Sequence, residues 1–271
     1  MNRFYKLAIP YLIWLIILVV IPLLTMLMLA FGNTIGADFS TYKFTFDNFS
    51  LITDFVYVRA FLNSIKIAGI TTLFCLVIGY SLAYAISTSK IKNKNLILLL
   101  LILPMWSNIL LRIVALENVF SSVSILNSFG IPTMDLKGTE FAVIFGCVTC
   151  YLPFMVFPIF TTLEKMDLSL LEASNDLGVD KIKSFFKVTV PLSMKGVVSG
   201  VIMVFLPSAT GFLVPKRLGA GNISMIGDII ERQFKTASNY NLGALLSLCI
   251  VFVILLAVLL LSKVDKDGET L

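Results

Sequence analysis

The sequence predicts an all-α integral membrane protein with six transmembrane helices, and three observations support this fold class. Of the 271 residues, 58% are hydrophobic and only 14% are charged, whereas a soluble globular domain carries about a quarter of charged residues. Six long runs contain no charged residue, and polar segments that contain lysine or arginine separate them. Helices satisfy their own backbone hydrogen bonds in lipid, so each run is predicted to cross the membrane as a helix.

The six predicted helices follow these charge-free runs. A helix crosses the hydrocarbon core with about 20 apolar residues, and the third run reaches this length only if Arg112 lies at the membrane edge. The run 118–134 is rich in Ser, Asn, Gly and Pro and is predicted to be a loop. A single membrane domain, residues 1–271, is expected, with spans at about 8–30, 62–88, 95–116, 141–163, 191–214 and 240–262.

The placement of lysine and arginine predicts the orientation of the chain. With the N-terminus inside, 12 of these residues lie in inner segments and 8 in outer segments. Cytoplasmic loops carry the excess of positive charge, so both termini and the polar loop 164–190 are expected in the cytoplasm. The apolar stretch after Arg3 and Lys6 is too long for a signal peptide and lacks a small-residue cleavage site, which predicts an uncleaved first span.

Composition also argues against several kinds of chemistry. The chain has no histidine, which removes histidine-based catalysis, haem ligation by histidine and most zinc sites. Cys147 and Cys150 form a C-x-x-C inside an apolar run, and without a second ligand pair they are predicted to be two small buried residues. No G-x-x-x-x-G-K-[ST] phosphate loop occurs in the sequence, so the chain is not expected to hydrolyse ATP.

The polar loop 164–190 is predicted to begin with a short helix. Asp167 and Ser169 are suitable N-caps, and Ser169 with Glu172 three residues later fits a capping box. Gly178 is placed to end this helix in the left-handed conformation that residues with a Cβ avoid.

A second short helix is predicted to follow and to lead back into the membrane. Asp180 can cap this helix through Lys181–Lys187, and Pro191 fits the first turn of the fifth span. The inward face of the first helix is expected to consist of Leu170, Leu171, Ala173, Ser174 and Leu177.

This loop resembles the EAA loop of ABC importer permeases. The resemblance is carried by Glu172, Ala173, Gly178, Val188, Val190 and Pro191, with Ser174 in place of the second alanine. It implies the type I importer permease architecture, in which such a loop sits in a cleft on an ATP-hydrolysing subunit and moves with it. By this resemblance the ATPase-coupling residues are Glu172, Ala173, Ser174, Leu177, Gly178 and Pro191.

Residues 5–260 look like spermidine/putrescine importer permeases of the PotB type. The similarity is carried by Asn63-Ser64, Gly79–Tyr84, Leu110–Arg112 after Pro104, Phe205–Phe212, Pro215, Leu218-Gly219 and Met225–Gly227. It implies a polyamine cargo and a place in the bacterial cytoplasmic (inner) membrane. The implied partners are a second permease subunit in a heterodimer, two copies of an ATPase subunit that binds ATP and Mg, and an extracytoplasmic substrate-binding protein. This chain is then expected to be no enzyme, to hold no cofactor or metal and to bind no nucleic acid.

The predicted substrate path combines broken helices with groups suited to a polycation. Helices broken near mid-membrane often line transport routes, and Pro207 with Gly211 marks such a break. Carboxylates and aromatic faces bind cations; the candidates are Glu117, Asp228, Glu231, Trp106, Tyr80 and Tyr84. The sequence departs from the PotB-type pattern at Gly211 and Lys216, where such permeases often have acidic residues, and at Val114-Ala115-Leu116, where they have Tyr-Ala-Trp.

Other functions remain open at this point. The same importer type could carry an amino acid, a sugar or an oxyanion, although only Lys66 and Arg112 are basic candidates for an anion path. A stand-alone secondary transporter usually has more spans or charged residues in mid-span. A membrane enzyme would need convergent catalytic groups within the spans, which the sequence lacks.

Overall fold

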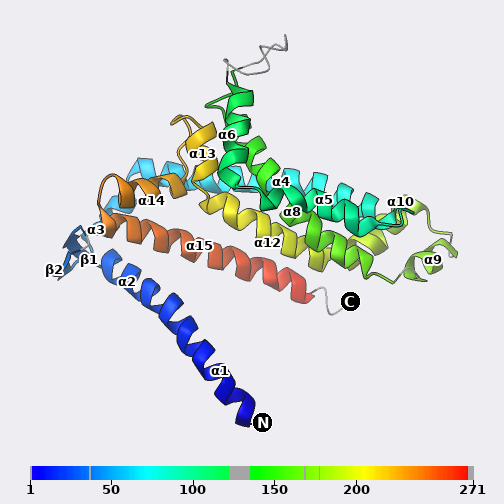
Figure 1. Ribbon diagram of the computed structural model, residues 1–271, viewed down its shortest axis with the longest axis horizontal. Coiled ribbons are helices and arrows are strands. Elements are labelled where there is room, and N and C mark those ends of the chain that lie inside the picture. The colour runs from blue at the N-terminus through cyan, green and yellow to red at the C-terminus, as the bar shows by residue number, and fades with distance from the viewer. Residues whose placement is uncertain (1, 37, 122–134, 168, 177, 268–271) are drawn as a thin grey trace. The chain divides into compact units, whose positions relative to one another are not determined.

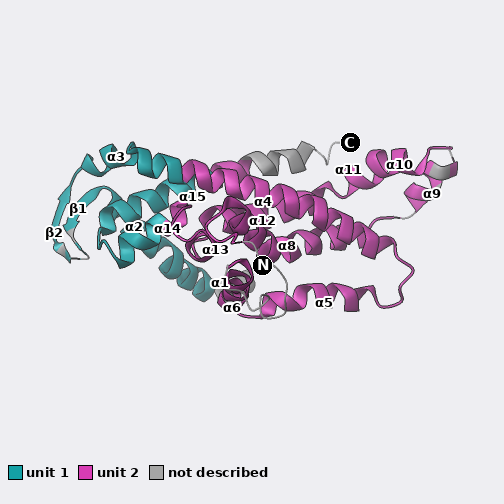
Figure 2. Ribbon diagram, turned by 90° about the horizontal axis from the view of Figure 1, so that it is seen from above, with its two compact units in different colours: residues 1–60, 229–253 teal, residues 61–228, 254–271 magenta. Residues whose placement is uncertain are grey.

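A computed structural model describes residues 2–36, 38–121, 135–167, 169–176 and 178–267. The chain divides into two compact units, residues 1–60 with 229–253 and residues 61–228 with 254–271 (Figure 2). Most of the predicted loop 118–134 lies outside the described residues, and its first residues belong to a helix that ends at Phe120.

The first unit begins with a long apolar helix and a β-hairpin (Figure 1). The helix is formed by α1 Asn2–Leu15, a π-helical turn η1 Ile16–Val20 and α2 Ile21–Ala30, and the antiparallel strands β1 Gly32–Ile35 and β2 Asp38–Phe44 follow it. The hairpin departs from the all-α prediction. The first charge-free run, residues 7–37, extends beyond the end of α2 at Ala30 and includes β1. Gly32 permits the close approach of Tyr42 on β2, since a Cβ there would lie 2.2 Å from the ring of Tyr42.

The hairpin is fixed to the other segment of the first unit by buried hydrogen bonds. Thr34 Oγ1 donates to Asn241 Oδ1, and the amide of Asn241 donates to the carbonyl of Thr34, both at 3.0 Å. A small core of Leu29, Ala30, Ala244 and Leu245 lies beside this pair of residues. The two ends of the sequence within this unit are therefore joined by polar and apolar contacts together.

The remaining helices are labelled in Figure 1. They are α3 Asp47–Ile52, α4 Phe55–Thr88, α5 Lys94–Trp106, α6 Ile109–Phe120, α8 Glu140–Glu164, α9 Ser169–Asp176, α10 Lys181–Ser184, the π-helical turn η2 Phe185–Thr189, α11 Val190–Leu192, α12 Met194–Thr210, α13 Leu213–Leu218, α14 Ile226–Lys235 and α15 Tyr240–Asp267.

Four helices among the described residues are long and apolar enough to cross a membrane, and two bent helix pairs raise the number to six if each pair is one span. The predicted third span, 95–116, is not straight: α5 and α6 meet at 86°. The break lies at Ser107 and Asn108, both extended, where the Asn108 side chain accepts the N–H of Leu110 and caps α6. The fifth span is bent by 65° just before α12.

The core of the second unit is built on α8, which packs along α12. A Cβ on Gly196 would lie 2.6 Å from the carbonyl oxygen of Pro158, and one on Gly200 would lie 2.7 Å from the sulfur of Met155. Glycines four residues apart let two membrane helices approach closely. Cys147 and Cys150 are free and almost fully buried in the same core, as the sequence predicted.

We predict that Gly196→Ala destabilises the protein by about 1–3 kcal/mol, because the methyl group would overlap backbone atoms of α8 that cannot move independently. Gly69→Ala is the matched control: Gly69 also lies within a helix, and nothing lies within 4 Å of its Cβ position. Thermal unfolding of the purified protein in detergent measures the difference. Equal melting temperatures for the two variants would show that the α8–α12 contact does not depend on glycine.

Candidate coupling segment and transport path

The loop after α8 begins with a carboxylate that holds the start of α9. Asp167 Oδ1 accepts the backbone N–H of Ser169 at 2.9 Å. This backbone hydrogen bond, with a second contribution from the Ser169 side chain, lowers the pKa of Asp167 below its usual value. The backbone of Glu172 lies in α9. Its side chain, which is one half of the predicted capping box, lies outside the described part of the structure.

Gly178 ends α9 as the sequence predicted. Its φ is +72°, in the left-handed region, and the N–H of Val179 donates to the carbonyl of Ser174 at 3.2 Å. This is the hydrogen bond of a Schellman motif, which reverses the chain after a helix. Ala173 is exposed and Ser174 is buried, while Leu177 lies outside the described residues.

The segment after Gly178 differs from the predicted second helix. Asp180 makes no capping hydrogen bond with its side chain, contrary to the prediction, and its carbonyl instead accepts the N–H of Ser184 at 2.8 Å. The helix also continues beyond Lys187 through the π-helical turn η2 into α11. Pro191 therefore lies in α11, ahead of the 65° bend, and not in the first turn of a straight fifth span.

Tyr80 and Tyr84 of α4 lie against this coupling segment, residues 164–193. The ring of Phe185 meets both tyrosine rings edge to face, with centroids 5.7 Å from Tyr80 and 4.9 Å from Tyr84. The hydroxyl of Tyr80 lies 2.9 Å from that of Ser193 at the bend. Both tyrosines therefore contact the coupling segment, and their assignment to a cargo path stays a prediction.

Glu117, near the end of α6, is a mostly enclosed carboxylate with two cationic neighbours. Its side chain is 19% exposed and lies 2.6 Å from Lys137 Nζ and 3.7 Å from a guanidinium nitrogen of Arg217 on α13. The sequence offered no sign of these partners, because they come from segments 20 and 100 residues away. The carboxylate of Glu117 therefore lies beside two cationic side chains.

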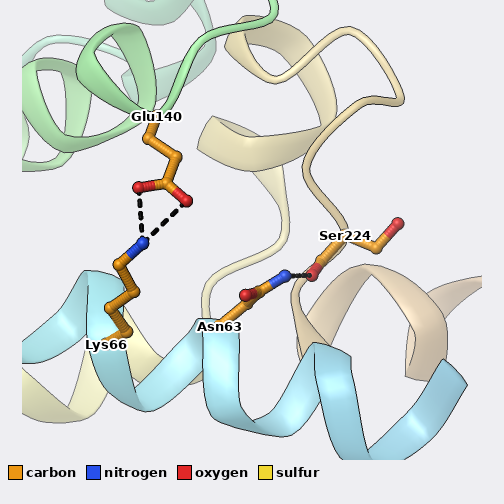
Figure 3. Close-up of polar contacts among 4 residues, drawn as sticks. All are labelled: Asn63, Lys66, Glu140 and Ser224. Atoms are coloured by element: carbon orange, nitrogen blue, oxygen red, sulfur yellow. Dashed lines mark hydrogen bonds and ion pairs between the residues drawn. The ribbon is translucent and has the colours of Figure 1, made fainter. Parts of the chain in front are cut away.

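A second ion pair joins α4 to α8. Lys66 Nζ lies 2.7 and 2.9 Å from the two oxygens of Glu140, with both side chains about half exposed (Figure 3). On the same helix, Asn63 donates to the carbonyl of Ser224 at 3.4 Å. One residue further along, the hydroxyl of Ser64 accepts the N–H of Ile226 at 2.8 Å and fixes the start of α14.

The other predicted path residues are distributed over several elements. The carbonyl of Pro207 in α12 accepts the N–H of Gly211 and the hydroxyl of Tyr151, at 2.9 and 3.4 Å. Trp106, at the end of α5, is 86% exposed and borders an apolar groove of about 270 Å³. Asp228 and Glu231 lie one turn apart on α14, where Asp228 is buried and Glu231 accepts a salt bridge from Lys235 at 3.0 Å.

Gly211 is closely packed at the end of α12. A Cβ there would lie 2.6 Å from the carbonyl of Pro207 and 3.2 Å from the hydroxyl of Tyr151. An acidic side chain at this position does not fit this arrangement without a shift. On α6, Arg112 has two buried guanidinium nitrogens, Nε and Nη1, with no hydrogen-bond partner among the described residues.

We predict that Glu117→Gln lowers thermal stability more than Glu140→Gln. Glu117 is mostly enclosed and has two cationic neighbours, whereas the half-exposed pair of Glu140 is screened by water and contributes at most about 1 kcal/mol. Melting curves at low and high salt measure both variants. If Glu140→Gln had the larger effect, the enclosed pair would not be the stronger one.

Comparisons with known proteins agree with this architecture. Residues 76–266 match the family described as "Binding-protein-dependent transport system inner membrane component". The chain is 33% identical to the "Spermidine/putrescine transport system permease protein PotB" of Haemophilus influenzae, over 98% of this chain and 95% of the relative. It is 36% identical to the protein of that name from Escherichia coli K12, over 93% of this chain and 94% of the relative.

Solved structures show the same fold. The "Crystal structure of a bacterial ABC transporter involved in the import of the acidic polysaccharide alginate" contains a chain that matches with a TM-score of 0.80 and 16% identity, over 97% of this chain and 95% of that chain. A second structure of the alginate transporter, with a pentasaccharide-bound periplasmic protein, gives a TM-score of 0.78 at 17% identity, over 97% of this chain and 94% of that chain. By sequence and by fold, the chain belongs to the family of binding-protein-dependent transport system inner membrane components.

Proposed function

We propose that the chain is the membrane-spanning permease subunit of an ATP-driven ABC importer that carries the polyamines spermidine and putrescine into the cytoplasm. The observation that supports this cargo most directly is the similarity over nearly the whole chain to spermidine/putrescine permeases, at 33–36% identity. The transport mechanism is alternating access, in which the path opens first to the outside and then to the inside. No bond in the cargo is broken.

The proposed engine is a separate ATPase subunit, present in two copies that bind ATP and Mg. It docks on the coupling segment, where Ala173 is exposed and the turn at Gly178 is stabilised by the Schellman hydrogen bond. Glu172, Ser174, Leu177 and Pro191 are the further coupling residues of this proposal. A second permease subunit completes the path, and an extracytoplasmic binding protein delivers the cargo. The chain lies in the inner membrane of a bacterium, with both termini in the cytoplasm.

The chemistry of a polyamine requires carboxylates along its route. Glu117 is the best candidate in the second unit, because its charge is already held in an enclosed site by two cations. An incoming ammonium group can replace Lys137 or Arg217 at little electrostatic cost, since one cation is exchanged for another. Pro207, Gly211, Trp106, Asp228 and Glu231 are further proposed path residues. Tyr80 and Tyr84 contact the coupling segment.

The function is tested with the complete complex in proteoliposomes. We expect uptake of labelled spermidine that requires ATP, the ATPase subunit and the binding protein, and that is competed by putrescine but not by amino acids, sugars or sulfate. Competition by one of those other solutes would assign that cargo to the same importer type. Uptake by this chain alone without nucleotide would indicate a secondary transporter and would overturn the proposal.

We predict that Gly178→Pro uncouples ATP hydrolysis from uptake while the spans stay inserted. Proline fixes φ near −65°, whereas the turn requires +72°. The control is Gly221→Pro, because Gly221 has a similar φ of +82°, and a Cβ at either glycine meets nothing within 4 Å. Uptake and ATP hydrolysis, measured together, should separate only in the Gly178 variant; normal uptake in that variant would contradict the coupling role.

A further inference from the structure

The bend between the coupling segment and α12 is tied to α4 at one buried residue. Ser193 lies at the 65° bend and is 1% exposed. Its hydroxyl donates to the carbonyl of Val190 at 2.9 Å and lies 2.9 Å from the hydroxyl of Tyr80. Either hydroxyl can donate in the bond between Tyr80 and Ser193; because a serine hydroxyl has one proton, Tyr80 is the donor when Ser193 donates to Val190. The relay therefore runs from Tyr80 through Ser193 to a backbone carbonyl of α11.

Aromatic rings support this relay from the other side. Tyr80 and Tyr84 lie four residues apart on one face of α4, and both contact the edge or face of Phe185. Phe185 is the first residue of the π-helical turn η2. The whole stretch from Phe185 to Ser193 is thus held on α4 at its beginning by rings and at its end by a hydrogen bond.

In and next to the same stretch, two buried side-chain hydroxyls have no hydrogen-bond partner among the described residues. The carbonyl of Phe185 accepts the N–H of Val190, five residues later, as in a π-helix. Thr189 Oγ1 and, just before the turn, Ser184 Oγ are buried without a hydrogen-bond partner among the described residues. In an α-helix a threonine hydroxyl commonly donates to the carbonyl four residues earlier, which here is that of Phe185. Tightening of the turn to α-helical hydrogen bonding would give Thr189 this partner.

We propose that residues 185–193 form a two-state hinge between the coupling loop and α12, and that Tyr80 is the positioning residue that latches one of its states. Single π-helical turns in α-helices are frequent at functional sites. At this hinge, movement of α9 and α10 changes the angle of the bend. The latch keeps Ser193 on α4 while the turn changes between π-helical hydrogen bonds, which span five residues, and α-helical hydrogen bonds, which span four. The inference rests on the proposed function of the chain as a permease driven by an ATPase subunit.

The test compares Tyr80→Phe with Tyr84→Phe in the complete importer. Both changes keep a ring against Phe185 and remove one hydroxyl, but only the Tyr80 hydroxyl makes a hydrogen bond to another described residue. We expect Tyr80→Phe to lower the number of polyamine molecules imported per ATP hydrolysed about fivefold. This is the factor by which the loss of one hydrogen bond typically changes the equilibrium between two states. Tyr84→Phe should leave this ratio unchanged.

Ser193→Ala examines the same hydrogen bond from its other end. It should reproduce the loss of coupling, and the double variant with Tyr80→Phe should be no worse than Ser193→Ala alone, since the hydrogen bond between Tyr80 and Ser193 is already absent in Ser193→Ala. Additive losses would show that the two residues act separately and would overturn the latch. If one single variant failed to insert or fold, the other would still decide.

The two states are measured directly with spin labels at Lys183 and Ser199, which are exposed and lie on either side of the bend. Three cysteines are buried, and Cys249 is replaced by serine for this experiment. We expect two label–label distances whose populations shift when ATP binds; one unchanged distance would overturn the hinge. A wild-type complex that neither hydrolyses ATP nor imports polyamine would refute the proposed function, whereas a working complex in which Tyr80→Phe behaves as Tyr84→Phe would refute only the latch.

Discussion

Close packing between α8 and α12 is the contact on which the second unit depends. Lipid tails are as apolar as the side chains, so two membrane helices gain little from burial alone and must gain from close approach. Gly196 and Gly200 allow this approach, since a side chain at either position would overlap α8. Met155 fills the space beside Gly200 and also meets Gly79 of α4. One residue of α8 thereby sets the distance to two neighbouring helices.

Because α12 is held along its length, its two ends become places where geometry can change. At one end lies the bend at Ser193, whose hydroxyl contacts the Tyr80 hydroxyl and the carbonyl of Val190. At the other end Gly211 stops the helix and α13 follows, which brings Arg217 toward Glu117. In the proposed function, α12 carries motion from the coupling segment at one end to the candidate path residue Glu117 at the other.

The elements set by local chemistry were predictable. Charge-free runs identified the apolar helices because lipid excludes charged groups, and Gly178 identified the end of α9 because few other residues tolerate a φ of +72°. The spacing of Gly196 and Gly200 also fits close helix contact, but it was not among the predictions from the sequence. Asp180 was predicted wrongly, since a suitable residue type does not guarantee that its side chain turns toward the helix.

The sequence by itself determined which stretches are helical and apolar, where the polar loop lies and to which family the motifs point, since these depend on residues near one another in the chain. Only the tertiary structure decided that Tyr80 and Tyr84 meet Phe185, that Glu117 is paired with Lys137 and Arg217, and that two spans are bent. These pairs join residues 20 to 105 positions apart in the sequence. They follow from how helices pack, which no local pattern of hydrophobicity or capping specifies.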